Sequence, residues 1–521
     1  MDAGANLVLY CLPRPTVTSA ATFAVAEGEG HDGKDHISAL PDDLLHDVVS
    51  RLPIRYAVRT TTLSTRWRDI WRYAPLVLFD LHISGSSAST QPEHVAAINS
   101  VLASHMGPLR TVHLALCNFN NHEPELAEWP KILAGRGVQE TRTSILRCAK
   151  LCRLYLGFWK FPDTTNLPVG AADFPQLQEL AILGVLMEDR DLDHMLASSP
   201  ALEKLALVMS YSPKHVRLIG QNLKRVIIYY STAVEVVVAA APCLERLIIW
   251  GMCPYTQIDE SEDSHVGVRI VEVEGAPALK VLGYLDTRVH QLQIGNTVIE
   301  ADTEENPSFM IPSVKIFALK VDFLVFTEVQ MLSSFLRCFP NVETLHVEVA
   351  NLKGGLGAAV EPTVCNWKVP GSSPSLCTFV RFARTDQPTG KHYGEFLSKL
   401  SPIECLQSHT KNVVLREFRG DLSEVVFIQH LTQRVNQLQK LTIVLSKDIL
   451  LSVDDMKVVL RELARPQWAS KSCTVLVVGP KHAWNFNRAI DLSTDDPFDS
   501  EHGQEFFCFS KDGDQTVWKH Q

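Results

Sequence analysis

The apolar positions between residues 37 and 73 follow the spacing of short amphipathic helices. The first run of them fits one helix face, at positions i, i+1, i+4, i+5 and i+8: Leu44, Leu45, Val48, Val49 and Leu52. Pro41 suits the first turn of such a helix, and Pro53 stops it one residue after its last apolar position. Asp42 and Asp43 complement the positive end of the helix dipole. The sequence therefore predicts a helix with both ends defined.

Two further short helices are expected directly after it. The second runs from about Arg55 to Thr62, and Ser64 is placed to cap a third that carries Trp67, Ile70 and Trp71 on one face. Helices this short are marginal alone, and a unit of roughly 40 residues has too small a core to be robust. We expect the apolar surface of this unit to be completed by a neighbouring domain or by a partner chain.

Beyond residue 100, a short apolar phrase of the form L-x-x-L recurs. Its first apolar positions are Leu177, Leu202, Leu223, Leu244, Leu279, Val314 and Val342. The early intervals of 25, 21 and 21 residues match leucine-rich repeats, which run about 20 to 29 residues. Each phrase should form a strand whose alternate residues enter the core, and the repeats should stack into a solenoid. Leu109 to Leu114 and Leu151 to Leu156 are expected to begin the array.

Loops and a C-terminal α/β unit follow from the remaining pattern. The polar stretch 257–265 and the Gly-, Pro- and Ser-rich stretch 354–375 interrupt the repeats and are interpreted as loops. Strands over 413–418, 438–443 and 474–478 alternate with helices over 425–435 and 453–463, a unit that can continue or cap the solenoid. The tail beyond Gly479 is acidic and is expected to be mobile.

Composition and charge narrow the classes of protein. The chain has 521 residues, is 46% hydrophobic and carries a net charge of -10, so a large core is expected and a global nucleic-acid or membrane signature is absent. Its 12 cysteines are scattered without a C-x-x-C pair, which indicates reduced thiols in a cytosolic or nuclear protein. Cys405 with His409 is the nearest metal-like fragment, and a zinc site there is disfavoured. No apolar run is long enough to predict a membrane span.

The first 34 residues and a cluster of arginines need separate interpretations. The leader is rich in Ala, Thr and Val, and Arg14 is the one base between Asp2 and Glu27, so disorder is favoured over an organelle transit peptide. Six arginines give the helical module a basic surface that an acidic protein partner or solvent could satisfy: Arg51, Arg55, Arg59, Arg66, Arg68 and Arg72. The aromatic and basic interleaving of an RNA platform is missing, so we expect no nucleic-acid partner.

The helical module resembles the plant form of the F-box family. The resemblance rests on the Leu40-Pro41 and Leu52-Pro53 pairs and on Leu63-Ser64 followed by Trp67 and Trp71. It implies a three-helix module that docks on a Skp-type adaptor and, through it, on a cullin and a RING subunit. The implied adaptor contacts are Leu40, Pro41, Leu44, Leu45, Val48, Leu52, Pro53 and Trp67. The alternative is a purely structural helical cap, in which these side chains face inward.

The C-terminal unit looks like the FBD domain found behind plant F-box and leucine-rich repeats. The residues that carry the similarity are Leu415, Phe418, Gly420, Glu424, Phe427, Leu438, Leu441 and Ile443. The predicted order is a disordered leader (1–34), an F-box (35–80), leucine-rich repeats (100–350), a loop-rich connection (351–400), an FBD-like domain (401–480) and a tail (481–521). The fold class is α/β: a three-helix F-box, then a leucine-rich-repeat solenoid with a C-terminal α/β cap.

The resemblance implies a substrate-recognition subunit of an SCF-type ubiquitin ligase, acting in the nucleus or cytoplasm. The chain has no G-x-S-x-G, H-E-x-x-H or phosphate-loop signature, so we expect a subunit that is not an enzyme and carries no cofactor or metal. The alternatives are a leucine-rich-repeat scaffold or ligand-binding module whose F-box-like helices are only structural and, less favoured, an unrecognised hydrolase. The leucines of the repeats are core residues, so a protein target must be bound by exposed side chains and loops that the sequence does not identify.

Overall fold

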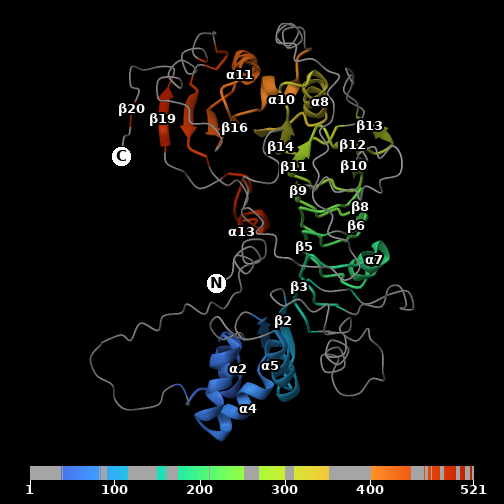
Figure 1. Ribbon diagram of the computed structural model, residues 1–521, viewed down its shortest axis with the longest axis vertical. Helices are drawn as coiled ribbons and strands as arrows, with labels where there is room; N and C mark the ends of the chain where they lie inside the picture. The colour runs from blue at the N-terminus through green and yellow to red at the C-terminus, as the bar shows by residue number, and fades with distance from the viewer. Residues whose placement is uncertain are drawn as a thin grey trace. The chain divides into compact units, whose positions relative to one another are not determined.

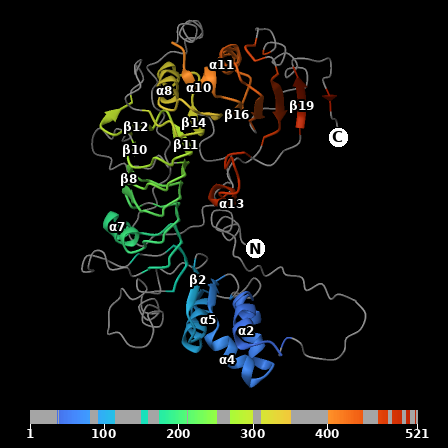
Figure 2. The same cartoon turned by 180° about the vertical axis from the view of Figure 1, so that it is seen from behind.

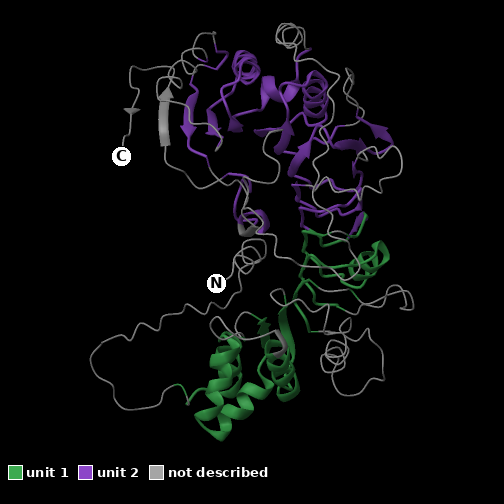
Figure 3. Cartoon of the chain, viewed as in Figure 1, with its two compact units in different colours: residues 1–214, 220–223 green, residues 215–219, 224–521 purple. Residues whose placement is uncertain are grey.

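The computed structural model describes the chain in separate stretches. They are residues 37, 39–80, 83, 91–114, 150–158, 161, 174–210, 212–251, 269–299, 310–350, 401–446, 463, 468–470, 472–480, 486–499, 505–510 and 517–518. The expected leader, the loops at 257–265 and 354–375, and the expected helix 453–463 apart from Leu463 lie outside these residues. The described parts form two compact units, residues 1–214 with 220–223 and residues 215–219 with 224–521 (Figure 3).

Unit 1 begins with the predicted helical module. Its helices are α2 (Asp42–Ser50), α3 (Ile54–Arg59), the 3-10 turn η1 (Thr60–Thr62) and α4 (Thr65–Tyr73). The Ser64 hydroxyl accepts a hydrogen bond from the Trp67 amide, as expected for the cap of α4. Inward-facing side chains hold the helices together in one apolar cluster that includes Leu45, Val49, Trp67, Ile70 and Trp71. The three-helix prediction is confirmed.

The first repeats follow within the same unit. Strands β1 (Leu76–Phe79), β2 (Leu109–Leu114), β3 (Arg153–Gly157), β4 (Glu179–Leu183) and β5 (Lys204–Val208) pair in parallel in that order. Helix α5 (Gln91–Ser104) connects β1 to β2, and α7 (Asp189–Ala197) connects β4 to β5. The blue end of Figure 1 shows α5 beside α2 and α4. Leu154, Leu180 and Leu205 occupy equivalent positions and are buried, as the repeat pattern predicts.

Unit 2 contains two sheets. The larger runs in the order β7 (Arg225–Tyr229), β9 (Arg246–Trp250), β11 (Val281–Asp286), β14 (Ile316–Val321), β15 (Thr344–Val349), β16 (Asn412–Phe418), β17 (Lys440–Leu445), β18 (Thr474–Val478), β19 (Glu505–Ser510) and β20 (Val517–Trp518). The smaller runs β13 (Thr297–Val298), β12 (His290–Ile294), β10 (Arg269–Val273), β8 (Glu235–Ala240), β6 (His215–Ile219). The returning segments between β7 and β14 are therefore strands, which the sequence pattern did not distinguish from helices.

Helices replace the second sheet toward the C-terminus. Helix α8 (Phe326–Arg337) precedes β15, α10 (Glu404–Ser408) precedes β16, and α11 (Leu422–Arg434) joins β16 to β17 (Figures 1 and 2). The residues predicted to carry the FBD pattern serve the core: Phe418, Glu424 and Leu441 are all buried. Glu424 Oε2 accepts the amide hydrogens of Arg419 and Gly420 at 2.8 and 2.9 Å, which closes the turn before α11.

The predicted mobile tail differs from the structure over residues 486–499. Helix α13 (Phe486–Ile490) and the segment after it pack against the sheet of unit 2, and Ala489 and Phe498 are buried. The acidic composition suggested a solvated tail. The contacts that hold this segment come from residues more than 80 positions away, so local composition does not reveal them.

Candidate functional site

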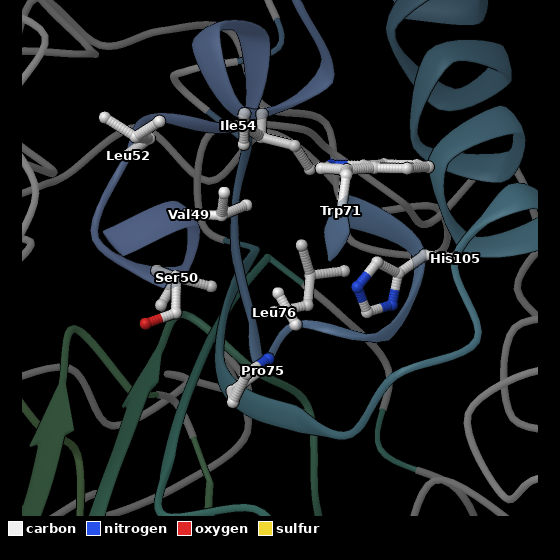
Figure 4. Close-up of a pocket in the computed structure, with 11 residues that line it drawn as sticks. Val49, Ser50, Leu52, Ile54, Trp71, Pro75, Leu76 and His105 are labelled. Carbon is white, nitrogen blue, oxygen red and sulfur yellow. The ribbon is translucent and has the colours of Figure 1, made fainter. Parts of the chain in front are cut away.

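The inward face of the helical module is a closed apolar core. Figure 4 shows Val49, Ile54, Trp71, Leu76 and His105 converging on it. The space between these side chains measures about 10 Å³, which is at most enough for a single water molecule. This space is therefore a packing feature and is too small for a small-molecule ligand.

The outward face of α2 carries an apolar stripe of Pro41, Leu44 and Val48. All three are exposed, Leu44 by 52% and Val48 by 40%. Positions i, i+3 and i+7 lie on one side of a helix, so these residues share a face. Leu40 and Leu52 are half-buried at its ends, where they pack on the apolar core. Apolar side chains grouped this way on a surface indicate a protein interface.

The stripe separates the predicted contact residues into two groups. Pro41, Leu44 and Val48 are available to a partner, whereas Leu45, Pro53 and Trp67 are buried in this chain. The spacing of apolar positions predicts that Leu44, Leu45, Val48 and Val49 lie on one face of the helix. Successive residues are about 100° apart around a helix, which turns Leu45 and Val49 inward and Leu44 and Val48 outward.

The contact residues predicted from the sequence do not include other exposed apolar residues of the module. Five large ones exceed one third exposure: Ile37, Tyr56, Val58, Leu63 and Tyr73. Leu63, at 65%, precedes the Ser64 cap, and Ile37 accepts the Leu40 amide through its carbonyl oxygen. Because neither belongs to a helical repeat of apolar positions, periodicity could not select them.

An ion pair fixes the start of α2 against α4. Arg66 Nη2 lies 2.6 Å from Asp42 Oδ1 and donates to Leu40 O at 2.6 Å, and its Nε donates to the same carboxylate at 2.9 Å. Such a fork holds two groups in one geometry, although an exposed pair adds little stability. Its contribution here is to orient the Leu40-Pro41 turn, where the apolar stripe begins. Arg51 pairs with Asp47 on the same helix at 2.7 Å.

His105 lies at the other end of the core, after α5. Its ring packs edge-on against Trp71, with centroids 5.4 Å apart. Burial lowers the pKa of His105 to about 4, against the opposing effect of backbone hydrogen bonds with Ala74 and Trp71. The histidine is therefore neutral in the folded protein at pH 7.

We expect acid to weaken this packing. The folded pKa of His105 lies below its unfolded value of 6.5, so its contribution is present above pH 6.5 and is lost as the pH falls toward 4. The loss approaches about 1.4 kcal/mol per pH unit. A His105→Phe variant, which keeps the ring and removes the titration, should lose less stability than wild type between pH 7 and pH 5 in thermal unfolding. Equal losses in the two proteins would contradict this assignment.

The fragment Cys405 and His409 lies at α10. Cys405 is buried, its Sγ lies 3.6 Å from Leu336 O, and burial raises the pKa of its thiol to about 12. A thiol in this state is a packing residue. Among the described residues, no group of three or more His, Cys, Asp or Glu side chains could hold a metal ion. Within the same residues, none of the helices has both the length and the apolar character to cross a bilayer.

Comparison with known proteins identifies three domains. The F-box domain model matches residues 37–78, the model described as "FBD-associated F-box protein At5g56370, LRR repeats" matches residues 126–347, and the FBD model matches residues 398–443. The chain thus carries an F-box, leucine-rich repeats and an FBD domain in that order, which confirms the resemblance and the fold class expected from the sequence.

Curated proteins of Arabidopsis thaliana are similar to this chain. The chain is 26% identical over 190 residues to the F-box/FBD/LRR-repeat protein At1g13570, covering 34% of this chain and 44% of the relative. It is 28% identical over 255 residues to the F-box protein At1g80960, covering 46% of each. With F-box/LRR-repeat protein 13 it is 22% identical over 501 residues, covering 86% of this chain and 98% of the relative. The first two matches span less than half of each relative's own length.

Proposed function

We propose that this chain is the substrate-recognition subunit of an SCF-type ubiquitin ligase. In this proposal the F-box binds a Skp-type adaptor, and the repeats bind a protein target. The observation that carries it is the apolar stripe of Pro41, Leu44 and Val48, which is exposed within the segment that matches the F-box model. A helical cap that served only its own chain would turn these side chains inward.

Catalysis is assigned to other subunits. The chain would hold a target beside a conjugating enzyme that carries ubiquitin. This would raise the local concentration of the target lysines near that enzyme. The matched F-box domain and the F-box/LRR relatives support a role as a non-catalytic subunit. The cullin and RING subunits would join through the adaptor, without contact to the apolar stripe.

Leu44→Asp tests the adaptor half. Burying a Leu side chain contributes about 1.5–3 kcal/mol, and a carboxylate in its place also has to be desolvated, so we expect adaptor affinity to fall at least about 100-fold. Affinity is measured by co-purification and calorimetry with the adaptor. Thermal stability should stay unchanged because Leu44 is exposed.

Ile219→Asp is the matched control for this substitution. Ile219 is also exposed, by 44%, but lies on β6 in unit 2, so the same chemical change there should leave adaptor binding intact. If Leu44→Asp bound the adaptor as tightly as wild type, the F-box helices would be only structural and the chain would be a leucine-rich-repeat scaffold.

A further inference from the structure

Residues 486–499, here called the covering segment, lie on one face of the larger sheet of unit 2. This face, the inner face, carries Arg246, His346 and Arg416, while the alternate residues Leu247, Leu345 and Leu415 enter the core. Figures 1 and 2 both show α13 on the inner side of the curve of that sheet. The structure therefore places a piece of the chain's own C-terminal region on a repeat surface that a partner could otherwise use.

Arginines of the sheet bind the backbone of the covering segment. Arg225 Nη1 donates to Ile490 O at the end of α13, and Arg246 Nη1 donates to Asp491 O at 2.8 Å. Arg416 Nη2 donates to Phe498 O at 2.6 Å. Three separate strands thus contact a short peptide through guanidinium groups, which suit carbonyl and carboxylate oxygens alike.

Two side chains of the covering segment fit specific partners on the sheet. Asp496 Oδ2 lies 2.8 Å from His346 Nε2. Phe498 is 1% exposed, and its ring packs against Tyr284 and Trp250 with centroids 5.1 and 6.2 Å apart. The sheet therefore accepts a carboxylate and, two residues later, an aromatic ring.

The charge on the inner face favours an acidic ligand. Burial and the charge of Arg225 lower the pKa of Arg246, while Asp491, Asp496 and Glu245 oppose this effect. Arg416 is buried, and its guanidinium interacts with the Tyr284 hydroxyl as well as with Phe498 O. The inner face therefore presents several guanidinium groups to the covering segment, and these groups favour oxygen-rich, acidic peptides.

The covering segment is buried at both ends and exposed between them. Ala489, Pro497 and Phe498 are buried, whereas Asp491, Ser493 and Asp495 are exposed. Beside it lies a cavity of about 320 Å³, lined by the sheet residues Arg246, Lys280 and Thr344 and by Leu492 and Asp495 of the segment. Displacing the segment exposes Phe498 and breaks the Asp496–His346 contact, so a competing ligand must supply equivalent groups.

We propose that the inner face is a peptide-binding site, and that the covering segment is an internal competitor for it. The ligand is an acidic peptide of a protein partner that carries an Asp two residues before an aromatic residue, as in Asp496-Pro497-Phe498. The ligand peptide displaces the covering segment and takes over its contacts with Arg246, His346 and Arg416. Peptide binding at the inner face does not depend on the proposed function. Only the identity of the partner as a ubiquitylation target rests on that function.

A peptide of residues 491–499, added to the full-length chain, tests the site. An opened variant, Asp496→Asn with Phe498→Ala, should bind this labelled peptide at least roughly 10-fold more tightly than wild type, because the competitor is weakened. Asp499→Asn is the matched control: its carboxylate lies 3.8 Å from Arg488 within the segment, and no described contact joins it to the sheet. This control should bind the peptide as wild type does.

Two further binding experiments test whether the peptide occupies the inner face. Adding Arg246→Gln and His346→Gln to the opened variant should abolish binding, and a peptide with Asn and Ala at its Asp496 and Phe498 positions should not bind. In wild type, excess peptide should speed amide hydrogen exchange of residues 486–499, a measurement that needs no variant. Equal affinity in opened variant and wild type, or unchanged exchange, would overturn the proposal. Leu44→Asp should change neither the peptide affinity nor the exchange of residues 486–499. A failure of the proposed adaptor binding can therefore be distinguished from a failure of this inference.

Discussion

Replacing Leu45 with Asp should unfold the F-box helices and abolish adaptor binding together. Leu45 is fully buried in the cluster that joins α2 to α4, so the substitution places an unpaired carboxylate in an apolar core. We expect a loss of at least about 4 kcal/mol in the stability of this module. Hydrogen exchange over residues 42–73 of the full chain, read beside adaptor co-purification, measures both effects.

The neighbouring variant Leu44→Asp is the control for this result. It has the same chemical change one position earlier, on the exposed side of α2. It should lose the adaptor while hydrogen exchange over residues 42–73 stays slow. If both variants kept slow exchange, the assignment of Leu45 to the core would be wrong.

Replacing Gly107 with Ala should separate α4 from the turn that leads into β2. A Cβ at Gly107 would lie 2.5 Å from Ala74 O and 2.6 Å from Tyr73 O, distances that require the backbone to move. The amides of Met106 and Gly107 both donate to Arg72 O at 2.8 Å, and these bonds would be strained. We expect a loss of about 3 kcal/mol, seen as faster exchange at these two amides and a lower Tm.

Gly295→Ala supplies the comparison for that substitution. Gly295 has φ of +57° and no atom within 4 Å of an added Cβ, so it carries the conformational cost without the collision. That cost is about 1 kcal/mol. If the Gly107→Ala variant were as stable as Gly295→Ala, the backbone around residue 107 would accommodate a Cβ without strain, and the prediction would be wrong.

The sequence predicted the elements well where the signal was local. The Ser64 cap, the start of α2 after Pro41 and the strand 474–478 depend on residues a few positions apart, and all three are present. Helix α2 ends at Ser50, two residues before the end that Leu52 and Pro53 predicted. Repeat spacing predicted the positions of Leu180, Leu205 and Leu247 in the core, because each stacks on its neighbour in the adjacent strand.

Two kinds of information were not in the local pattern. The division of Leu44 from Leu45 depends on which side of α2 the rest of the module packs, and two adjacent leucines look alike in sequence. The contact of Arg246 with Asp491 joins residues 245 positions apart, so neither periodicity nor composition of either segment indicates it. Separating the exposed residues of α2 from its core residues therefore needed the tertiary structure.

The junction between the F-box and the first repeats leaves no room for a hinge. Helix α4 ends at Tyr73 and β1 begins at Leu76, while Arg72 O accepts the two amides that precede β2. A rotation imposed on α4 must therefore pass into β1 and β2 as a rigid-body movement, because no flexible residues lie between them to absorb it. An adaptor that grips α2 would thereby set the direction in which these first strands point.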